Sequence, residues 1–234
     1  MWHRLTTRRG LALLVLGIAS INLASQTARG QVSAEESAKK AKPAPGLEAT
    51  LWASEPMVVN PTNMDIDSRG RVWITEGLNY RLTRGRNKEL PMLEEADRIK
   101  ILEDTDGDGK ADKMTVFADR IFPIPMGIAV EEKYNAAGKY VGCKVYVGNS
   151  PNLMVFEDTD GDDKADKRYP LLTGFGGVDS DHGVHGVTLA LDGKLYFTHG
   201  DGCCSVQPDK SAGDFHPISS RPCWAHTDVR TCVI

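Results

Sequence analysis

Short runs in which apolar and polar residues alternate recur along most of the chain, and alternation of this kind predicts β-strands. Ten runs of four to six residues show it, and they occupy residues 63–67, 71–76, 98–102, 114–118, 126–130, 144–148, 153–156, 169–172, 187–191 and 194–198. No segment keeps a helical period for more than about two turns. Only residues 90–102 are ambiguous between helix and strand. The sequence therefore predicts an all-β fold.

An acidic motif occurs twice with the same placement relative to these runs. Residues 103–113 read Glu-Asp-Thr-Asp-Gly-Asp-Gly-Lys-Ala-Asp-Lys, and residues 157–167 repeat them with one change, 54 positions later. Each copy lies between two predicted strands and so joins them as a hairpin, and another pair of strands precedes each hairpin. A third unit begins with a hairpin that turns at Asp192-Gly193, a strong two-residue turn signal.

Four strands in each unit of roughly 50–60 residues are typical of the blades of a β-propeller. Residues 47–201 contain about two and a half such units, whereas a closed propeller has at least about four blades. We therefore expect the N-terminal blades of a propeller, incomplete as a ring.

Residues 1–30 are typical of a secretory signal peptide. Three arginines precede a 14-residue apolar run at 11–24, which is shorter than the roughly 20 residues that span a bilayer. A small-x-small cleavage site fits at 28–30, and the pair Arg8-Arg9 leaves both the general and the twin-arginine export routes open. We expect a periplasmic or extracellular protein with no stable membrane span after cleavage; an uncleaved anchor is the alternative.

Two further segments have an unusual composition. Residues 31–46 are small, charged and proline-containing, which predicts a flexible linker. Residues 202–234 hold four of the five cysteines, show no alternating run and match no zinc or haem spacing. We interpret them as an atypical tail, disrupted or frame-shifted, with a disulfide-stapled tail as the alternative. The fifth cysteine, Cys143, lies in a predicted strand and should be a buried thiol.

The charge balance argues against two classes of partner. The formal net charge is -4, and residues 1–30 contain four of the 28 basic residues and none of the 32 acidic ones. The rest of the chain is therefore strongly acidic. A nucleic-acid binder that uses a broad basic face, or a protein held to anionic lipid by charge, is not expected.

The two acidic motifs place carboxylates at the spacing of a calcium-binding loop. Aspartates occupy positions 1, 3, 5 and 9 of an EF-hand-type loop, namely Asp104, Asp106, Asp108 and Asp112 in the first copy and Asp158, Asp160, Asp162 and Asp166 in the second. Thr115 replaces the bidentate glutamate of position 12, and the flanking strands exclude a helix-loop-helix. Gly109 allows the sharp turn at position 6, whereas Asp163 stands there in the second copy, which predicts a weaker site. Solvated hairpins without an ion are the alternative.

Histidines and carboxylates gather just before the third unit. His182 and His185 precede the run at 187–191, with Asp179 and Asp181 beside them, and His199 follows the next run. In a propeller the loop before the inner strand of a blade faces the mouth of the central channel. A histidine with a neighbouring carboxylate can act there as a general base near neutral pH. Structural histidines are the alternative.

The spacing from Asp181-His182 to the Asp-Gly-Lys-Leu-Tyr run at 192–196 and to Gly200-Asp201 resembles the soluble quinoprotein glucose/sorbosone dehydrogenases. That resemblance implies a six-bladed propeller of the TolB-like or quinoprotein glucose dehydrogenase-like type. Residues 47–201, with their Asp-Thr-Asp-Gly-Asp loops, are similar to exported bacterial propellers labelled membrane-bound dehydrogenases, which are often fused to a cytochrome c module.

The resemblance implies oxidation of a sugar or alcohol with pyrroloquinoline quinone, His182 as the base and Asp181 as its acidic neighbour, with a cytochrome c-type electron acceptor. Two features depart from the pattern. His185 and Gly186 stand where the family has glycine and arginine, and the basic residues that hold the quinone belong to later blades. We therefore expect this chain to be inactive alone, as a fragment. A non-catalytic exported propeller that binds calcium and a protein or glycan is the competing interpretation.

The signal-peptide interpretation predicts a mature chain that begins at Gln31 and stays in solution, because the apolar run is short and a polar segment follows it. N-terminal sequencing of protein recovered after export measures this directly. Exported protein that still begins at Met1 would contradict cleavage.

Overall fold

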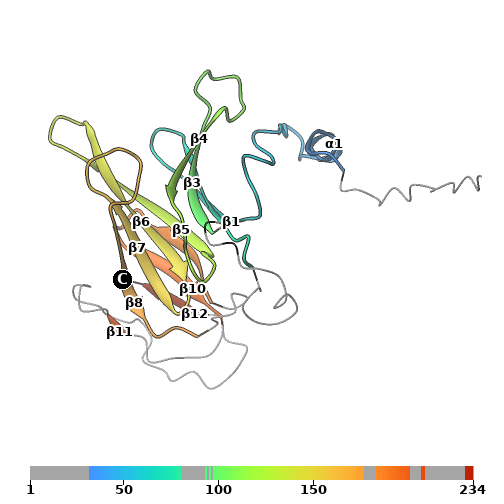
Figure 1. Ribbon diagram of the computed structural model, residues 1–234. Coiled ribbons are helices and arrows are strands. Elements are labelled where there is room, and N and C mark those ends of the chain that lie inside the picture. Colours follow the sequence, from blue (N-terminus) through green and yellow to red (C-terminus); the bar gives the residue numbers. More distant parts are fainter. Residues whose placement is uncertain are drawn as a thin grey trace, which may run out of the picture.

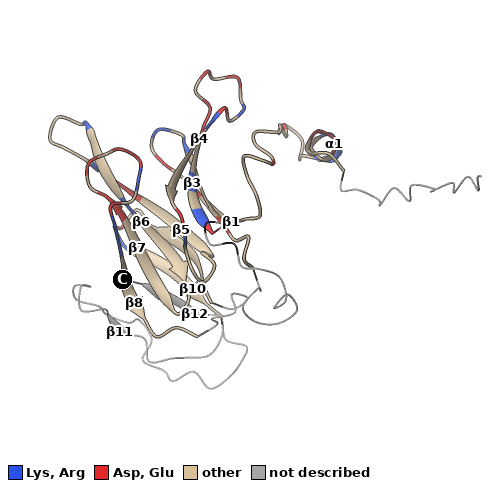
Figure 2. Ribbon diagram, viewed as in Figure 1, with Lys and Arg blue, Asp and Glu red and all other residues tan. Residues whose placement is uncertain are grey.

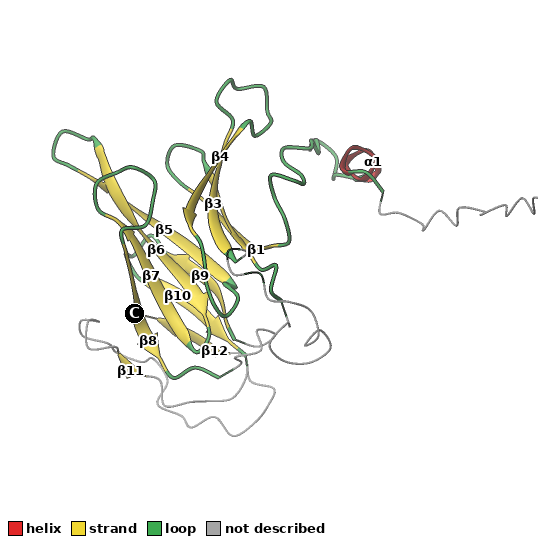
Figure 3. Cartoon of the chain, viewed as in Figure 1, coloured by secondary structure: helices red, strands yellow, loops and turns green. Residues whose placement is uncertain are grey.

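The computed structural model describes residues 32–80, 93, 95, 97–176 and 183–200, together with the backbone of residues 207–208 and 230–233. The described strands form three antiparallel sheets (Figures 1 and 3). The first sheet has the order β1 (Pro61–Ile66), β2 (Val72–Glu76), β3 (Arg98–Glu103) and β4 (Lys113–Ala118). The second has the order β5 (Gly127–Tyr134), β6 (Tyr140–Asn149), β7 (Asn152–Asp158), β8 (Lys167–Thr173) and β11 (Gln207–Pro208). The third has the order β9 (Val184–Leu189), β10 (Leu195–His199) and β12 (Arg230–Val233).

The ten predicted strands are all present, as β1 to β10, and the first two sheets are meanders that resemble propeller blades. One connection differs from expectation. The runs predicted at 126–130 and 144–148 leave residues 131–143 as the connection, but both strands extend into it. Asn135 closes a tight turn by accepting the backbone N–H groups of Ala137 and Lys139 at 3.0 Å. Cross-strand pairing of Glu131 with Lys144 in this extension favours the longer ladder.

The sheets stack face to face, and the first strand of each lies beside the first strand of the next. β1 contacts β5, and β5 in turn contacts β9. This is the relation that blades have around a propeller axis, where the first strands are innermost. The described part of the chain therefore contains three consecutive blade-like sheets.

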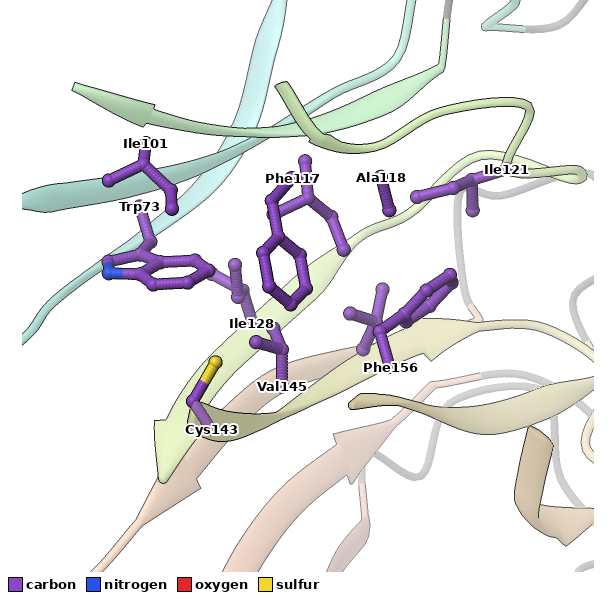
Figure 4. Packing of buried hydrophobic residues seen from close by; sticks show 11 residues of the cluster. Trp73, Ile101, Phe117, Ala118, Ile121, Ile128, Cys143, Val145 and Phe156 are labelled. Carbon is purple, nitrogen blue, oxygen red and sulfur yellow. The ribbon is translucent and has the colours of Figure 1, made fainter. Parts of the chain in front are cut away.

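A hydrophobic core fills the space between the first and second sheets (Figure 4). Trp73 and Phe117 of the first sheet meet edge to face, with their ring centroids 4.9 Å apart. Val145 and Phe156 of the second sheet point toward them and are fully buried. The predicted buried thiol is confirmed, because Cys143 lies in this core as a free cysteine whose pKa burial raises to about 11.

A second core joins the second and third sheets. Leu153 and Leu172 of the second sheet pack against Val184 and Phe197 of the third, and the ring of Phe175 meets that of Phe197 at 5.7 Å. Successive residues of a strand point to opposite faces of the sheet, and in the second sheet apolar residues on one face enter the first core while those on the other face enter the second core. The second sheet is therefore apolar on both faces. A sheet of this composition is stable only between two neighbours.

The connections divide between two edges of the stack. Links from first to second strand and from third to fourth strand lie at one edge, which holds the two acidic loops (residues 103–113 and 157–167; Figure 2). Links from second to third strand and from one sheet to the next lie at the other edge. This follows from antiparallel order, since successive connections alternate ends.

Both terminal segments differ from what the sequence predicted. The linker expected at 31–46 contains the helix α1 (Ala34–Lys40), which Ser33 caps by accepting the backbone N–H of Glu36 at 3.1 Å. Acids in its first turn and lysines in its last turn favour it electrostatically, although it buries nothing. In the tail, where no strand was predicted, β12 pairs with β10. Among the described residues, no helix is long and apolar enough to cross a membrane.

The first core predicts a large cost for truncating Phe117, which is 2% exposed and lies against Trp73. Phe117→Ala should lower the free energy of unfolding by about 3–5 kcal/mol, because it removes buried contacts and leaves a cavity. Leu191→Ala, at a fully exposed position, is the matched control and should stay within about 0.5 kcal/mol. Denaturant titration of both variants checks this, and equal midpoints would contradict the packing.

Candidate functional site

The first acidic loop is shaped by its own aspartates. Asp104 accepts the backbone N–H groups of Gly107 at 2.8 Å and of Gly109 at 2.9 Å. Both glycines have positive φ, which lets the chain turn tightly around the carboxylate. Asp112 closes the loop by accepting the side-chain hydroxyl of Thr105 at 2.7 Å, and this hydrogen bond lowers the pKa of Asp112.

Three of the four predicted ligands of the first loop converge. Asp104, Asp106 and Asp108 each offer one carboxylate oxygen, and these oxygens lie within 4.8 Å of one another. Asp112 is not in this group; it accepts the backbone N–H and the side-chain hydroxyl of Thr105. Calcium takes six to eight oxygen ligands, including carbonyls and water. Three clustered carboxylates fit such an ion as part of its coordination, and backbone carbonyls or water would complete it.

The second acidic loop has the same backbone plan with a different carboxylate set. Asp158 is fully buried and accepts backbone N–H groups of Asp160 and Gly161 at 3.1 and 2.7 Å. The clustered oxygens belong to Asp158, Asp160 and Asp166, so here position 9 takes part and Asp162 does not. The sequence therefore found both clusters, but one of the four predicted ligands in each lies outside the group.

Asp163, the single difference between the motifs, links the second loop to the first sheet. It adopts the left-handed conformation expected at this position, with φ of 64°. Its carboxylate accepts from Arg71 Nη1 at 2.7 Å. Arg71 Nε donates at 2.8 Å to Asp67, which also accepts the indole N–H of Trp73 at 2.9 Å. Burial raises the pKa of Asp67, but the hydrogen bonds from Trp73 and Arg71 outweigh it and the pKa is lowered.

This arrangement gives the two loops different electrostatics. The guanidinium of Arg71 compensates part of the acidic charge of the second loop, whereas among the described residues no arginine pairs with the first loop. Asp163 is the one carboxylate that the second loop has in addition to those of the first, and it is the one that Arg71 pairs with. Like charges in the clustered carboxylates repel in both loops, which favours a bound cation in each. The sequence predicted a weaker second site from the missing glycine, and this ranking stays a prediction.

The opposite edge holds the connection that carries the predicted catalytic residues. The backbone N–H groups of Gly174 and Phe175 both donate to the carbonyl of Pro151 at 3.0 Å, and that of Val184 donates to Ser150 Oγ at 2.8 Å. The connection from β8 to β9 thus leaves and returns at one corner, the turn between β6 and β7. Asp179, Asp181 and His182 lie outside the described residues.

The other two histidines of the segment have places in the third sheet. His185 lies in β9, and its carbonyl accepts the hydroxyl of Thr198 at 3.1 Å. His199 is buried at the end of β10, with its ring 5.3 Å from that of Phe175. His199 is therefore part of the packing between the second and third sheets.

Sequence reasoning missed a buried ion pair in the first sheet. Lys100 Nζ lies 2.8 Å from Glu76 Oε1, and both side chains are almost fully buried. Lys100 also donates to the carbonyl of Met57 at 2.9 Å, and Glu76 accepts the backbone N–H of Val59 at 2.8 Å. The pair fixes the segment that precedes β1. A lysine between two isoleucines of a predicted strand was the one available signal.

Comparison with known proteins gives a family and a distant structural neighbour. The family model described as a domain of unknown function, DUF7133, matches residues 33–230. A gluconolactonase from Xanthomonas campestris, described as important in glucose secondary metabolic pathways, is similar with a TM-score of 0.40 and 16% identity. The similarity covers 70% of this chain and 49% of that one, so the chain spans about half of its length. No curated protein matches the chain.

The loop geometry predicts that calcium raises the melting temperature, mainly through the first loop. A ligand that binds only the native state at a hundredfold excess over Kd stabilises it by about 2.7 kcal/mol. The Asp106→Ala, Asp108→Ala double variant should lose most of the shift, because it removes two of the three clustered carboxylates.

Glu35→Ala, Glu36→Ala is the matched control, since it removes two exposed acids of α1 and leaves both loops intact. Thermal unfolding with calcium and with chelator is compared for all three proteins. Identical melting curves of the unaltered chain in the two conditions would eliminate the metal site.

Proposed function

This chain belongs to the DUF7133 family, and we propose that it supplies blades of an exported propeller enzyme, a quinone-dependent dehydrogenase of sugars or alcohols. The observation that carries the proposal is the segment Asp181-His182, which enters β9, the first strand of its sheet. Its spacing to Asp192 and to Gly200-Asp201 is the feature shared with quinoprotein dehydrogenases.

The fold gives this segment a suitable setting. Both ends of its connection are held at the corner formed by Ser150 and Pro151, and His182 is two residues before the anchored Val184 in the sequence. Loops at this edge are kept apart from the acidic loops at the other edge. A base can therefore sit at one edge while bound cations stabilise the other.

In the proposed reaction, pyrroloquinoline quinone would supply the hydride acceptor when bound. This chain contributes the proton acceptor. His182 takes the proton of the substrate hydroxyl, while the carbon that bears this hydroxyl loses a hydride and becomes a carbonyl. Asp181 orients the imidazole and favours its charged form. A cytochrome c-type protein would serve as the electron acceptor, and the reaction would take place outside the cytoplasm.

A second function, non-catalytic binding of calcium and of a protein or glycan, is favoured by the two carboxylate clusters at one edge. The two proposals differ in what His182 does. In the enzyme it moves a proton, whereas in a binding scaffold its removal affects at most local packing.

The enzyme proposal predicts that His182→Ala lowers quinone-dependent dye reduction by about 10²–10⁴-fold, the usual contribution of a general base. His185→Ala is the matched control and should cost less than tenfold, since His185 lies within β9. The assay uses a relative that carries the same Asp-His segment together with later blades. This chain alone, given quinone, calcium and sugar, should give no turnover.

Two results would contradict this. A loss below tenfold in His182→Ala, with the fold retained, would assign His182 a structural role and favour the binding scaffold. Dye reduction by this chain alone would show that later blades are not needed to hold the quinone.

A further inference from the structure

Four residues ahead of β1 repeat the sequence of the last strand of the first sheet. Residues 50–53 read Thr-Leu-Trp-Ala, and residues 115–118 at the end of β4 read Thr-Val-Phe-Ala. The spacing to the next sheet is also similar, because β1 begins eight residues after Ala53 and β5 begins nine residues after Ala118. We call residues 50–53 the 50–53 segment. Its sequence and spacing are those of a fourth strand.

The 50–53 segment contacts the first sheet as β4 contacts the second. In the second acidic loop, Ala165 donates its backbone N–H to the carbonyl of Phe117 at 2.9 Å. Ala111, which holds the same position in the first acidic loop, donates to the carbonyl of Trp52 at 2.9 Å. Trp52 matches Phe117 in the sequence repeat. The segment therefore lies where the fourth strand of a sheet packed on the first sheet would lie.

The 50–53 segment differs from β4 in having no neighbouring strand. β4 pairs with β3 along its length. Among the described residues, the carbonyl of Trp52 is the one backbone group of the segment that has a hydrogen-bond partner. Beyond the segment the chain is fixed, because the buried pair Lys100–Glu76 binds the carbonyl of Met57 and the backbone N–H of Val59. Extended chain with free N–H and C=O groups is a template for strand addition.

The face of the first sheet beside this segment repeats a face that is buried in the second sheet. The same cross-strand pairs relate five positions of the first sheet, Met64, Ile66, Val72, Ile74 and Leu102, to five of the second, Ile128, Val130, Val145, Val147 and Phe156. In the second sheet these residues pack in the core against the first sheet. In the first sheet Met64 and Ile66 are 54% and 58% exposed.

The five positions of the first sheet line a groove of about 800 Å³, and Leu51 and Trp52 line it with them. The 50–53 segment thus borders a face whose residues are those of a contact between two sheets. The interface between the first and second sheets shows what such a face packs against, namely the apolar side chains of the second, third and fourth strands of a neighbouring sheet.

The acidic loops differ at the position that contacts the preceding sheet. Asp163 of the second loop lies 2.7 Å from Arg71 of the first sheet, whereas Gly109 holds this position in the first loop. Arg71 is buried. A buried base at the matching position of a sheet over the groove would lack this carboxylate, which is costly. A neutral residue is therefore expected there.

We infer that the groove binds three strands of a further blade-like sheet and that the 50–53 segment is the fourth, outermost strand of that sheet. The partner is a later blade of the same propeller. It presents apolar residues at the positions that Trp73, Ile99 and Ile101 hold in the first sheet, and a neutral residue at the position of Arg71. This contact is independent of the catalytic role proposed for His182.

The test compares this chain with a member of the family that carries the same groove residues together with later blades. Amide hydrogen exchange is measured by mass spectrometry in both proteins. Strand pairing should slow exchange in the 50–53 segment of the longer protein at least about tenfold. The turn at residues 135–139 of the second sheet is the matched control and should exchange alike in both. Equal exchange of the 50–53 segment in the two proteins would overturn the inference.

Ile66→Lys tests the groove face itself. In the longer protein it should lower the melting temperature by about 5 °C or more, because it places an unpaired charge in a buried contact. In this chain, where Ile66 is 58% exposed, the shift should be below about 2 °C. Leu191→Lys, at a fully exposed position, is the matched control and should shift neither protein by more than about 2 °C.

Failure of the longer Ile66→Lys protein to fold, while Leu191→Lys folds, counts as the large shift. A shift below about 2 °C in the longer Ile66→Lys protein would show that the groove stays open to water, and would overturn the inference.

Discussion

The second sheet is apolar on both faces, and this constraint organises the whole stack. Val145 and Phe156 face the first sheet, while Leu153 and Leu172 face the third. Neither face can be left in water without losing the free energy of burying large side chains, roughly 1.5–3 kcal/mol for each. The first and third sheets are therefore held in place by the second. The far face of the first sheet, with Met64 and Ile66 exposed, is not covered by another sheet in the described part of the chain.

Stacking of antiparallel meanders separates two kinds of loop. At one edge the acidic hairpins repeat one plan, in which the aspartate at position 1 accepts two or more backbone N–H groups of its own turn. Connections at the other edge differ in length, from the two residues between β6 and β7 to the ten between β8 and β9 and the 21 between β2 and β3. Loops of this second kind usually carry binding and catalytic residues on a rigid scaffold. The proposed function accordingly gives the acidic loops a stabilising role and places the base before β9.

The two acidic loops are nearly identical in sequence but contact different neighbouring residues. In the second loop Asp163 meets Arg71, an arginine that is 92 positions away and belongs to another sheet. In the first loop the equivalent position is Gly109, which has no side chain to form such a pair. Both loops share a backbone hydrogen bond to a neighbouring segment, from Ala111 to Trp52 and from Ala165 to Phe117. The ion pair therefore offsets the additional carboxylate of the second loop. The hydrogen bond from Ala111 joins the segment before β1 to the first loop.

The sequence by itself determined the strands, the hairpins and the three repeated units, because alternation and turn residues act over a few positions. It also located the aspartates that cluster and the buried Cys143. Tertiary structure decided the rest. It selected which aspartates of each loop converge. The pairing of Lys100 with Glu76 and of Arg71 with Asp163, and the addition of β12 to the third sheet, join residues far apart in the chain. The local sequence pattern does not identify such partners. A charged residue in a predicted strand gives the same pattern whether its side chain faces water or a buried residue of opposite charge.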